Sequence, residues 1–241
     1  MNYLSVLSIF KNEARNLDIW IKHYIWMGVE HFYLIDNGSD DNYMEILQKY
    51  IDKGIVTLYV LDEKYAIMKH TRFVYDAERI WEKSKWLLIV DLDEFWYCLN
   101  STISNELKNL EMYDVIISRW RLFGTSGCIT HPDDIRIANI HTESVHPHGT
   151  KYLFKTAAVK SEQIEIHSIT NNDNTYIDVE TFRINHYCIQ SLEYFQNVKM
   201  IRGDAESSGN DHIRNMDYFH RYDSAATIID EDLKNMVLSS N

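Results

Sequence analysis

The chain has 241 residues, of which 45% are hydrophobic and 13% aromatic, a composition typical of a globular protein with a substantial core. Its 24 basic and 36 acidic side chains give a net charge of −12, so no excess of cations is available to bind the phosphates of nucleic acid nonspecifically. Only two prolines and eight glycines occur, and no segment has the composition of a linker. We therefore expect a single domain over residues 1–241.

The sequence of the first 90 residues alternates between strand-like and helix-like patterns. Strands are predicted at Tyr3–Phe10, His31–Ile35, Ile55–Leu61 and Trp86–Val90. Helices are predicted at Glu13–Met27, from Asp41 to about Asp52, and at His70–Lys83. Four strands that alternate with three helices predict a parallel sheet with right-handed crossovers.

The pattern is looser in the second part of the chain. We expect a short helix at Ser104–Leu110, an irregular histidine-rich segment at Phe123–His148, a helix at Leu192–Arg202, and one or two helices within Asp211–Leu238. Further strands are expected at Asp114–Trp120, Lys151–Val159 and Gln163–His167.

Cysteine usage and the absence of long apolar runs bear on location. Cys98, Cys128 and Cys188 are odd in number and match no C-x-x-C pattern, which favours reduced thiols and a cytoplasmic location. The first apolar run is short and soon interrupted by charges, and no later run reaches about 18 apolar residues. We expect no integral membrane segment, so a membrane-borne substrate would be reached by peripheral association through a partner or a surface contact.

The segment Lys85–Cys98, KWLLIVDLDEFWYC, is the most informative part of the sequence. Its apolar run is followed at once by three carboxylates, Asp91, Asp93 and Glu94. Ligands of open α/β sheets bind at the carboxyl ends of strands, and clustered carboxylates are costly unless a cation or strong donors neutralise them. Oxygen ligands suit Mg²⁺ or Mn²⁺, ions that usually carry substrate phosphates as well.

Polar clusters follow three of the predicted strands, at Lys11–Glu13, Asp36–Asp41 and Asp91–Glu94. In a parallel sheet these loops lie along one edge, so the clusters together predict one pocket. Taken singly, the first cluster also fits a helix cap and the second a turn with an N-cap.

A zinc site was the competing metal hypothesis. Several histidines crowd the middle of the chain, namely His131, His141, His146, His148 and His167. His146 and His148 form an H-x-H that could bind zinc from a strand, but Pro147 and Gly149 indicate a loop. We therefore expect no dedicated zinc site.

Several motifs resemble those of nucleotide-sugar glycosyltransferases of the GT-A fold, especially family 2 and the related family 92 group. They are F-K-N-E after the first strand, the block from Trp20 to Asp41, D-L-D-E-F from Asp91 to Phe95, and more weakly W-R-L-F-G-T-S-G (Trp120–Gly127) and the segment Asn185–Gly203. The resemblance implies a GT-A, Rossmann-like α/β fold with a mostly parallel sheet flanked by helices. It implies a nucleotide-binding half at 1–100, a looser acceptor-side half at 101–203 and a C-terminal helical tail at 204–241.

The resemblance also implies roles for individual residues. Asn12 and Glu13 would border the nucleotide pocket, and Asp36 would accept hydrogen bonds from the base or ribose. Asp91 and Asp93 would hold Mn²⁺ or Mg²⁺ against the diphosphate, with His186 completing the site.

Two further sets of residues are left with open alternatives. Trp120 and Arg121 would form the acceptor wall, unless Trp120 is a buried strand-end residue. Lys199 and Arg202 would either neutralise phosphate or lie on a solvated helix face, of which we favour the second.

An inverting reaction needs a general base, and the candidates after W-R-L-F-G-T-S-G are Asp133, Asp134 and Glu143. The sequence lacks the E-D pair of many family 2 enzymes, so the choice among the three stays open.

The resemblance thus implies a metal-dependent inverting glycosyltransferase that moves a sugar from a nucleoside-diphosphate sugar to a glycan acceptor, in surface polysaccharide or glycoconjugate synthesis. UDP is the usual nucleotide of the family, and the residues themselves leave GDP or another base open. One alternative is a sugar-nucleotide nucleotidyltransferase, but such enzymes usually open with a glycine-rich loop, and L-S-I-F-K-N-E has no glycine. The other is a catalytically inactive carbohydrate-binding protein of the same fold, against which the intact Asp91, Asp93 and Glu94 argue.

Overall fold

The computed structural model describes residues 1–64, 66–144, 149–178, 180–202 and 214–240. The first part of the chain contains, in order, β1 (Asn2–Phe10), α1 (Ala14–Trp26), β2 (His31–Asp36), α2 (Tyr43–Ile51), β3 (Val56–Val60), α3 (Ile67–Ala77), α4 (Ile80–Lys83) and β4 (Ser84–Ile89). The four predicted strands and the helices between them are confirmed. The predicted helix at His70–Lys83 is divided in two because Arg79 has a left-handed backbone, with φ of 50°.

The middle of the chain adds shorter elements: β5 (Glu94–Tyr97), α5 (Ile103–Asn109), β6 (Val115–Leu122), α6 (Ile135–Ala138), β7 (His141–Glu143), β8 (Thr150–Lys155), β9 (Thr175–Ile177) and β10 (Arg183–His186). The strand predicted at Gln163–His167 is wrong. A 3₁₀ turn at Ser161–Gln163 and an isolated bridge between Ile164 and Ile169 occupy that region. The segment expected to be irregular, Phe123–His148, contains α6 and β7, while His146 and His148 lie outside the described residues.

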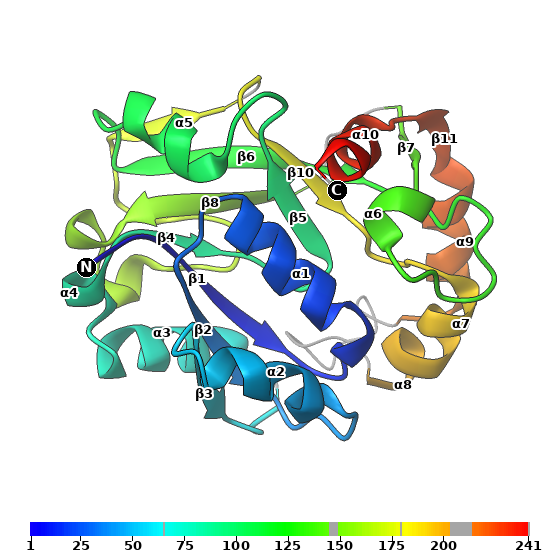
Figure 1. Ribbon diagram of the computed structural model, residues 1–241, viewed down its shortest axis with the longest axis horizontal. Helices are drawn as coiled ribbons and strands as arrows, with labels where there is room; N and C mark the ends of the chain where they lie inside the picture. The colour runs from blue at the N-terminus through cyan, green and yellow to red at the C-terminus, as the bar shows by residue number, and fades with distance from the viewer. Residues whose placement is uncertain (65, 145–148, 179, 203–213, 241) are drawn as a thin grey trace.

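The last part of the chain contains α7 (Leu192–Tyr194), a π-helical turn at Phe195–Lys199, α8 (Met200–Arg202), α9 (Met216–Ala225), β11 (Ala226–Ile229) and α10 (Asp232–Ser239). The predicted helix at Leu192–Arg202 is therefore confirmed, with a π turn in its middle. Figure 1 shows α6, β7, α9, β11 and α10 gathered at one side of the molecule, on the right of the view.

Nine strands of the described residues form one curled sheet, in the order β3-β2-β1-β4-β8-β6-β10-β5, with β9 paired to β6. The first four strands are parallel, as predicted. Strand β8 runs antiparallel to both β4 and β6, and β5 runs antiparallel to β10, so the second half of the sheet is mixed. Strands β7 and β11 form a separate pair.

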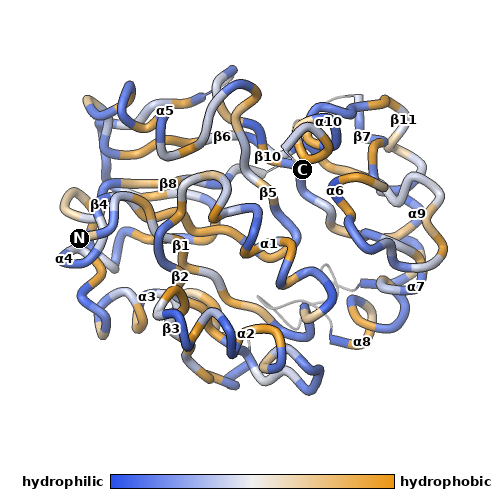
Figure 2. The backbone as a smooth tube through the Cα atoms, in the orientation of Figure 1, coloured by the Kyte–Doolittle hydropathy of each residue, from blue (hydrophilic) through white to orange (hydrophobic). Residues whose placement is uncertain are grey.

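The core lies on both faces of this sheet. On one face α1, α2, α5 and α10 pack on the strands, with large apolar side chains such as Leu17, Trp20 and Leu107 fully buried. On the other face α3 and α4 contribute Val74, Tyr75 and Ile80. Figure 2 shows hydrophobic stretches along the central strands β6 and β8. In the described part of the chain no helix has both the length and the hydrophobicity that crossing a membrane requires.

Candidate active site

A cavity of about 410 Å³ opens at the carboxyl edge of the sheet. The polar side chains on the described part of its wall are Lys11, Asn12, Glu13, Asn37, Asp40, Lys64, Asp91, Asp93, His167, His186, Lys199, Arg202 and Arg214. Most of them follow β1, β2 or β4, or lie at the end of β10 and on the segment after it, while Lys64 follows β3 and His167 lies between β8 and β9. The loops that the sequence places at one edge of the sheet therefore do meet around one cavity.

Asp93 is the centre of the ionic contacts in the cavity. Its Oδ2 accepts a hydrogen bond from the Lys199 ammonium, and its Oδ1 lies 3.5 Å from Nε2 of His186, the last residue of β10. Burial by itself would raise the pKa of Asp93, but the charge of Lys199 and the contact with His186 outweigh burial and hold this pKa well below its usual range. Asp93 is therefore a charged carboxylate at neutral pH, although its side chain is largely buried.

Asp91 is paired with Lys151 of β8. The Lys151 Nζ donates to Asp91 Oδ2 at 2.8 Å and lies 3.8 Å from Glu94 Oε2. Burial alone would lower the pKa of Lys151, but the carboxylates of Asp91 and Glu94 outweigh burial and raise it. Asp91 therefore reaches the cavity as one half of an ion pair.

Glu94 supports the turn that carries Asp91 and Asp93, from behind the cavity wall. Its Oε2 accepts a hydrogen bond from the Asp91 N–H at 3.0 Å, and its side chain has no exposed surface. Burial raises the pKa of Glu94 well above its ordinary value, against the opposing charge of Lys151. Glu94 thus fixes the backbone that carries the two aspartates and has no place on the described wall.

Glu13 is held by three side chains from the segment after β10. Its Oε1 accepts from Arg202 Nη2 at 2.6 Å and lies 3.8 Å from Lys199 Nζ, and its Oε2 accepts from the Tyr194 hydroxyl at 2.5 Å. Only 3% of the Glu13 side chain is exposed. Glu13 therefore orients two cations towards the cavity.

The loop after β2 is shaped by Asp36 and contacts the loop after β1. Asp36 Oδ1 accepts from the Ser39 N–H at 2.8 Å and Oδ2 from the Tyr43 hydroxyl at 3.1 Å. Asn12, with φ of 55°, accepts from the Asp40 N–H through Oδ1 at 2.9 Å. Asn12 lines the cavity as expected, whereas Asp36 is 2% exposed and has no place on its described wall.

Trp120 lies beside His186 on the cavity wall. Its ring is centred 4.4 Å from the ring of His186 and 5.0 Å from that of His167. Neighbouring residues of a strand point to opposite faces, and Arg121 accordingly turns away to form an ion pair with Asp230. Trp120 is therefore available to a ligand in the cavity, and Arg121 is committed to the C-terminal segment.

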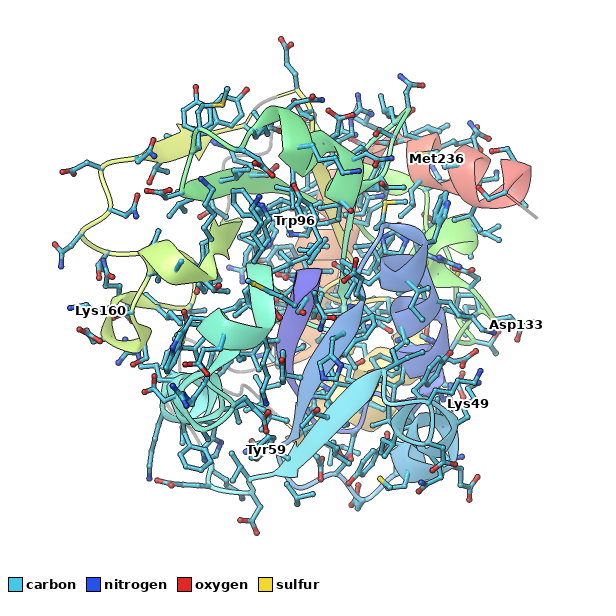
Figure 3. All side chains as sticks on the ribbon, turned by 60° about the vertical axis from the view of Figure 1, so that its left-hand side comes forward. Lys49, Tyr59, Trp96, Asp133, Lys160 and Met236 are labelled. Atoms are coloured by element: carbon cyan, nitrogen blue, oxygen red, sulfur yellow. The ribbon has the colours of Figure 1, made fainter. Side chains whose placement is uncertain are left out.

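The three candidate bases are not brought to the described wall of the cavity. Asp133 is exposed, and Figure 3 shows it at the edge of the molecule. Asp134 caps α6 and forms an ion pair with Arg136 at 2.5 Å. Glu143 lies in β7, opposite Ala226 of β11.

For two basic residues of the site the sequence favoured the wrong alternative, and a third was missed. The solvated position favoured for Lys199 and Arg202 is wrong, because their side chains are only 6% and 16% exposed and both line the cavity. Lys151 was not singled out. The signal that would have found it is a lysine next to Tyr152, Leu153 and Phe154 in a predicted buried strand, a position that requires a carboxylate partner.

Of the three expected metal ligands, Asp93 and His186 form a close pair on the cavity wall, while Asp91 reaches the cavity paired with Lys151. Asp93 Oδ1 and His186 Nε2, 3.5 Å apart on the wall, are at a separation that one ion can bridge with bonds of about 2.1 Å. Within the described ranges no three Asp, Glu, His or Cys side chains are grouped closely enough to hold an ion by themselves. The residues therefore fit an ion that is bound jointly by protein and substrate phosphates, as Mg²⁺ and its relatives usually are.

Comparisons with known proteins bear on the family of the chain. The family model of Glycosyltransferase family 92 matches residues 4–236. A family 92 protein of Oryza sativa subsp. japonica is 25% identical over 202 residues, covering 80% of this chain and 34% of that protein. A family 92 protein of Arabidopsis thaliana is 23% identical over 219 residues, covering 80% of this chain and 36% of that protein. The chain thus spans about a third of the length of these relatives.

Likeness to solved structures is more distant. Residues 1–349 of S. aureus TarS in complex with UDP superimpose with a TM-score of 0.45 and 11% identity, over 76% of this chain and 60% of that chain. The α/β sheet with its flanking helices and the family match together confirm the predicted GT-A class of fold. The chain belongs to glycosyltransferase family 92.

Proposed function

We propose that the chain is a metal-dependent, inverting glycosyltransferase that transfers a sugar from a UDP-sugar to a glycan acceptor, in surface polysaccharide or glycoconjugate synthesis. The observation that carries the proposal is the Asp93–His186 pair, which lies next to two buried cations at the carboxyl edge of the sheet. UDP is the nucleotide implied by the resemblance in the first hundred residues.

The cavity combines an ion site with an unusual share of positive charge for an acidic protein. Four carboxylates, Glu13, Asp40, Asp91 and Asp93, share the described wall with five basic residues, Lys11, Lys64, Lys199, Arg202 and Arg214. Such a concentration of cations attracts and orients a diphosphate within a chain whose net charge is −12.

In this proposal each residue around the ion has a role in the transfer. Asp93 and His186 would hold Mn²⁺ or Mg²⁺, which supplies positive charge to the diphosphate leaving group. Lys199 lies beside the same carboxylate and adds a second cation where negative charge develops. Arg202, held by Glu13, keeps its guanidinium fixed on the cavity wall. Trp120 presents an aromatic face for a sugar ring, of the donor or of the acceptor.

Inversion at the anomeric carbon remains part of this proposal, although no residue is assigned as the general base. Asp133, Asp134 and Glu143 have no place on the described wall, so we do not assign the base to any of them. The anomeric configuration of the product, read by NMR, tests inversion directly.

The proposed location is cytoplasmic, with peripheral contact to any membrane-borne acceptor. It is supported by the three cysteines, which all carry free thiols in the structure. Cell fractionation tests it.

Calorimetric titration with UDP, GDP and CDP, in Mn²⁺ and in excess chelator, tests the donor class. We expect one diphosphate to bind only with metal, and Asp93→Asn to abolish that binding. Asp114→Asn removes a carboxylate that is paired with Lys155 outside the cavity, so it serves as the matched control and should bind normally. Binding of a diphosphate that is unchanged by chelator, or that persists in Asp93→Asn, would contradict the proposed metal site. Absence of binding in every condition would contradict the donor class.

A further inference from the structure

We propose that the free protein binds its divalent cation weakly and takes it up together with the nucleoside diphosphate, because two buried lysines already neutralise the aspartates of the motif. The inference rests on the proposed function and deepens it. Its basis is the set of ionic contacts made by Asp91 and Asp93.

Each aspartate has its own ammonium partner. Lys199 Nζ donates to Asp93 Oδ2, and Lys151 Nζ donates to Asp91 Oδ2 at 2.8 Å. The two lysines come from different elements, the π turn after α7 and strand β8, and are only 5% and 1% exposed. Because neither side chain can swing into solvent without leaving the core, both charges are permanent features of the cavity.

The charges of this inner group are balanced before any metal arrives. Asp91, Asp93 and Glu13 contribute three negative charges, and Lys151, Lys199 and Arg202 contribute three positive charges through the pairs that they form. The buried Glu94, behind the wall, changes this balance by at most one negative charge. A site that attracts a divalent cation on its own needs a clear excess of carboxylate, and this group has almost none.

A cation that enters alone therefore meets repulsion. An ion on Asp93 Oδ1 would share its carboxylate with the Lys199 ammonium on Oδ2, so two positive charges would lie next to each other in a largely buried place. Among the described residues it would also find no group of three protein ligands, where Mg²⁺ and Mn²⁺ prefer six ligands.

A diphosphate removes both obstacles at once. Its oxygens supply the missing ligands, and its negative charges offset the ion and leave Lys199 and Arg202 with a partner on the substrate. Charge and ligand number therefore lead to the same conclusion, that the ion and the diphosphate bind as a pair.

Electron paramagnetic resonance of Mn²⁺, which distinguishes free from bound ion without turnover, tests the proposal. Wild-type protein is titrated with Mn²⁺ alone and then with UDP present, and we expect at least about tenfold tighter Mn²⁺ binding with UDP. Equal Mn²⁺ affinity with and without UDP, in protein to which UDP binds by calorimetry, would overturn the inference.

The lysine variants test the cause and need no nucleotide. In Lys199→Met, Mn²⁺ alone should bind roughly tenfold to a thousandfold tighter, the effect that one nearby charge has on proton affinity. Lys199→Arg keeps the charge and should bind Mn²⁺ as weakly as wild type. Lys53→Met makes the same change of net charge at an exposed position and is the matched control.

The outcomes separate this inference from the proposed function. If Lys199→Met binds Mn²⁺ no more tightly than Lys53→Met, the inference is overturned, whether or not UDP binds to the protein. Failure of UDP, GDP and CDP to bind with Mn²⁺ contradicts the proposed function, and the Mn²⁺ titrations of the variants still decide the inference. Should circular dichroism show that Lys199→Met is unfolded, Lys151→Met tests the same charge balance, with tighter Mn²⁺ binding expected.

Discussion

The position of Trp120 on the cavity wall depends on a glycine. A Cβ added at Gly149 would lie 2.1 Å from Cε3 and Cζ3 of the Trp120 ring, far closer than two carbon atoms can approach. The Trp120 ring in turn contacts His186, one of the two proposed metal ligands. A single side-chain atom at position 149 would therefore displace the aromatic wall and, through it, the ion site.

We expect Gly149→Ala to weaken metal-dependent nucleotide binding by at least about tenfold, because misplacement of a site residue by an ångström is enough for such a loss. Calorimetric titration with UDP and Mn²⁺ measures this. Gly54→Ala is the matched control, since Gly54 also has a positive φ, of 68°, but an added Cβ there meets no described atom within 4 Å. Equal effects of the two substitutions would show that backbone strain, and not the Trp120 contact, is responsible.

At the residue scale, the sequence predicts site residues that belong to one motif and misses ion pairs between residues far apart in the chain. Asp91 and Asp93 were identifiable because they follow a strand, and His186 because its segment resembles a family motif. Lys151 became visible only when the fold brought it to a carboxylate 60 residues away, and the choice between the two alternatives for Lys199 depended on a carboxylate 106 residues away. Asp36 was predicted to bind a ligand, but its side chain serves the local turn, which is the commoner use of an aspartate at a strand end.

At the scale of elements, α1 is joined to β5 by a buried histidine. His23 Nε2 lies 2.7 Å from the carbonyl oxygen of Trp96, and the His23 side chain is fully buried. Burial, together with the nearby charge of Arg136, lowers the pKa of His23 to about 3. The neutral ring is therefore part of the folded state at all ordinary pH values.

This histidine makes stability depend on pH. Below the unfolded pKa of about 6.5 the unfolded chain binds a proton that the folded chain does not, so the free energy of unfolding falls by about 1.4 kcal/mol per pH unit from this group. The stability is fully present above pH 6.5 and is lost as the pH falls towards the folded pKa. Glutamine retains a donor for the Trp96 carbonyl but does not titrate. We therefore expect His23→Gln to reduce the slope of unfolding free energy against pH between 6.5 and 4.5, measured by urea titration; equal slopes would show that His23 is not the cause.

The elements found from sequence are those with their own periodicity. Strands β1 to β4 and helices α1 to α3 have continuous apolar runs or a buried face, so a local pattern defines them. Strands β5, β9 and β10 have three or four residues each and exist through pairing with distant partners, such as Arg183 with Tyr97. No local pattern of that length distinguishes a strand from a loop.

At the scale of the molecule, the C-terminal segment is part of the main body. Leu233 and Val237 of α10 are buried in the same core as β1 and α1. Arg121 of β6 pairs with Asp230, and Arg183 of β10 pairs with Asp232. The tail, whose role was not readable from the sequence, is thus anchored to the two strands that carry Trp120 and His186.

Leu233→Ala should destabilise the whole protein by about 2–5 kcal/mol, as is usual when a fully buried leucine is truncated. Leu238 lies on the same helix but is 53% exposed, so Leu238→Ala should change stability by no more than about 0.5 kcal/mol. Urea unfolding followed by circular dichroism measures both. A small effect of Leu233→Ala would mean that the tail unfolds independently of the domain.

The π turn at Phe195–Lys199 has a consequence for how this protein tolerates changes in length. A π turn accommodates one residue more than an α turn, so the residues after it keep the phase of a regular helix that is one residue shorter. Deleting the exposed Gln196 would therefore let the turn close into a regular α turn with Lys199 and Arg202 still directed at the cavity. Inserting a residue exceeds what the turn already accommodates and would rotate every later residue by about 100°. Lys199 and Arg202 would then leave the cavity together, without any change in their own identity, so this segment should tolerate the loss of one residue far better than the gain of one.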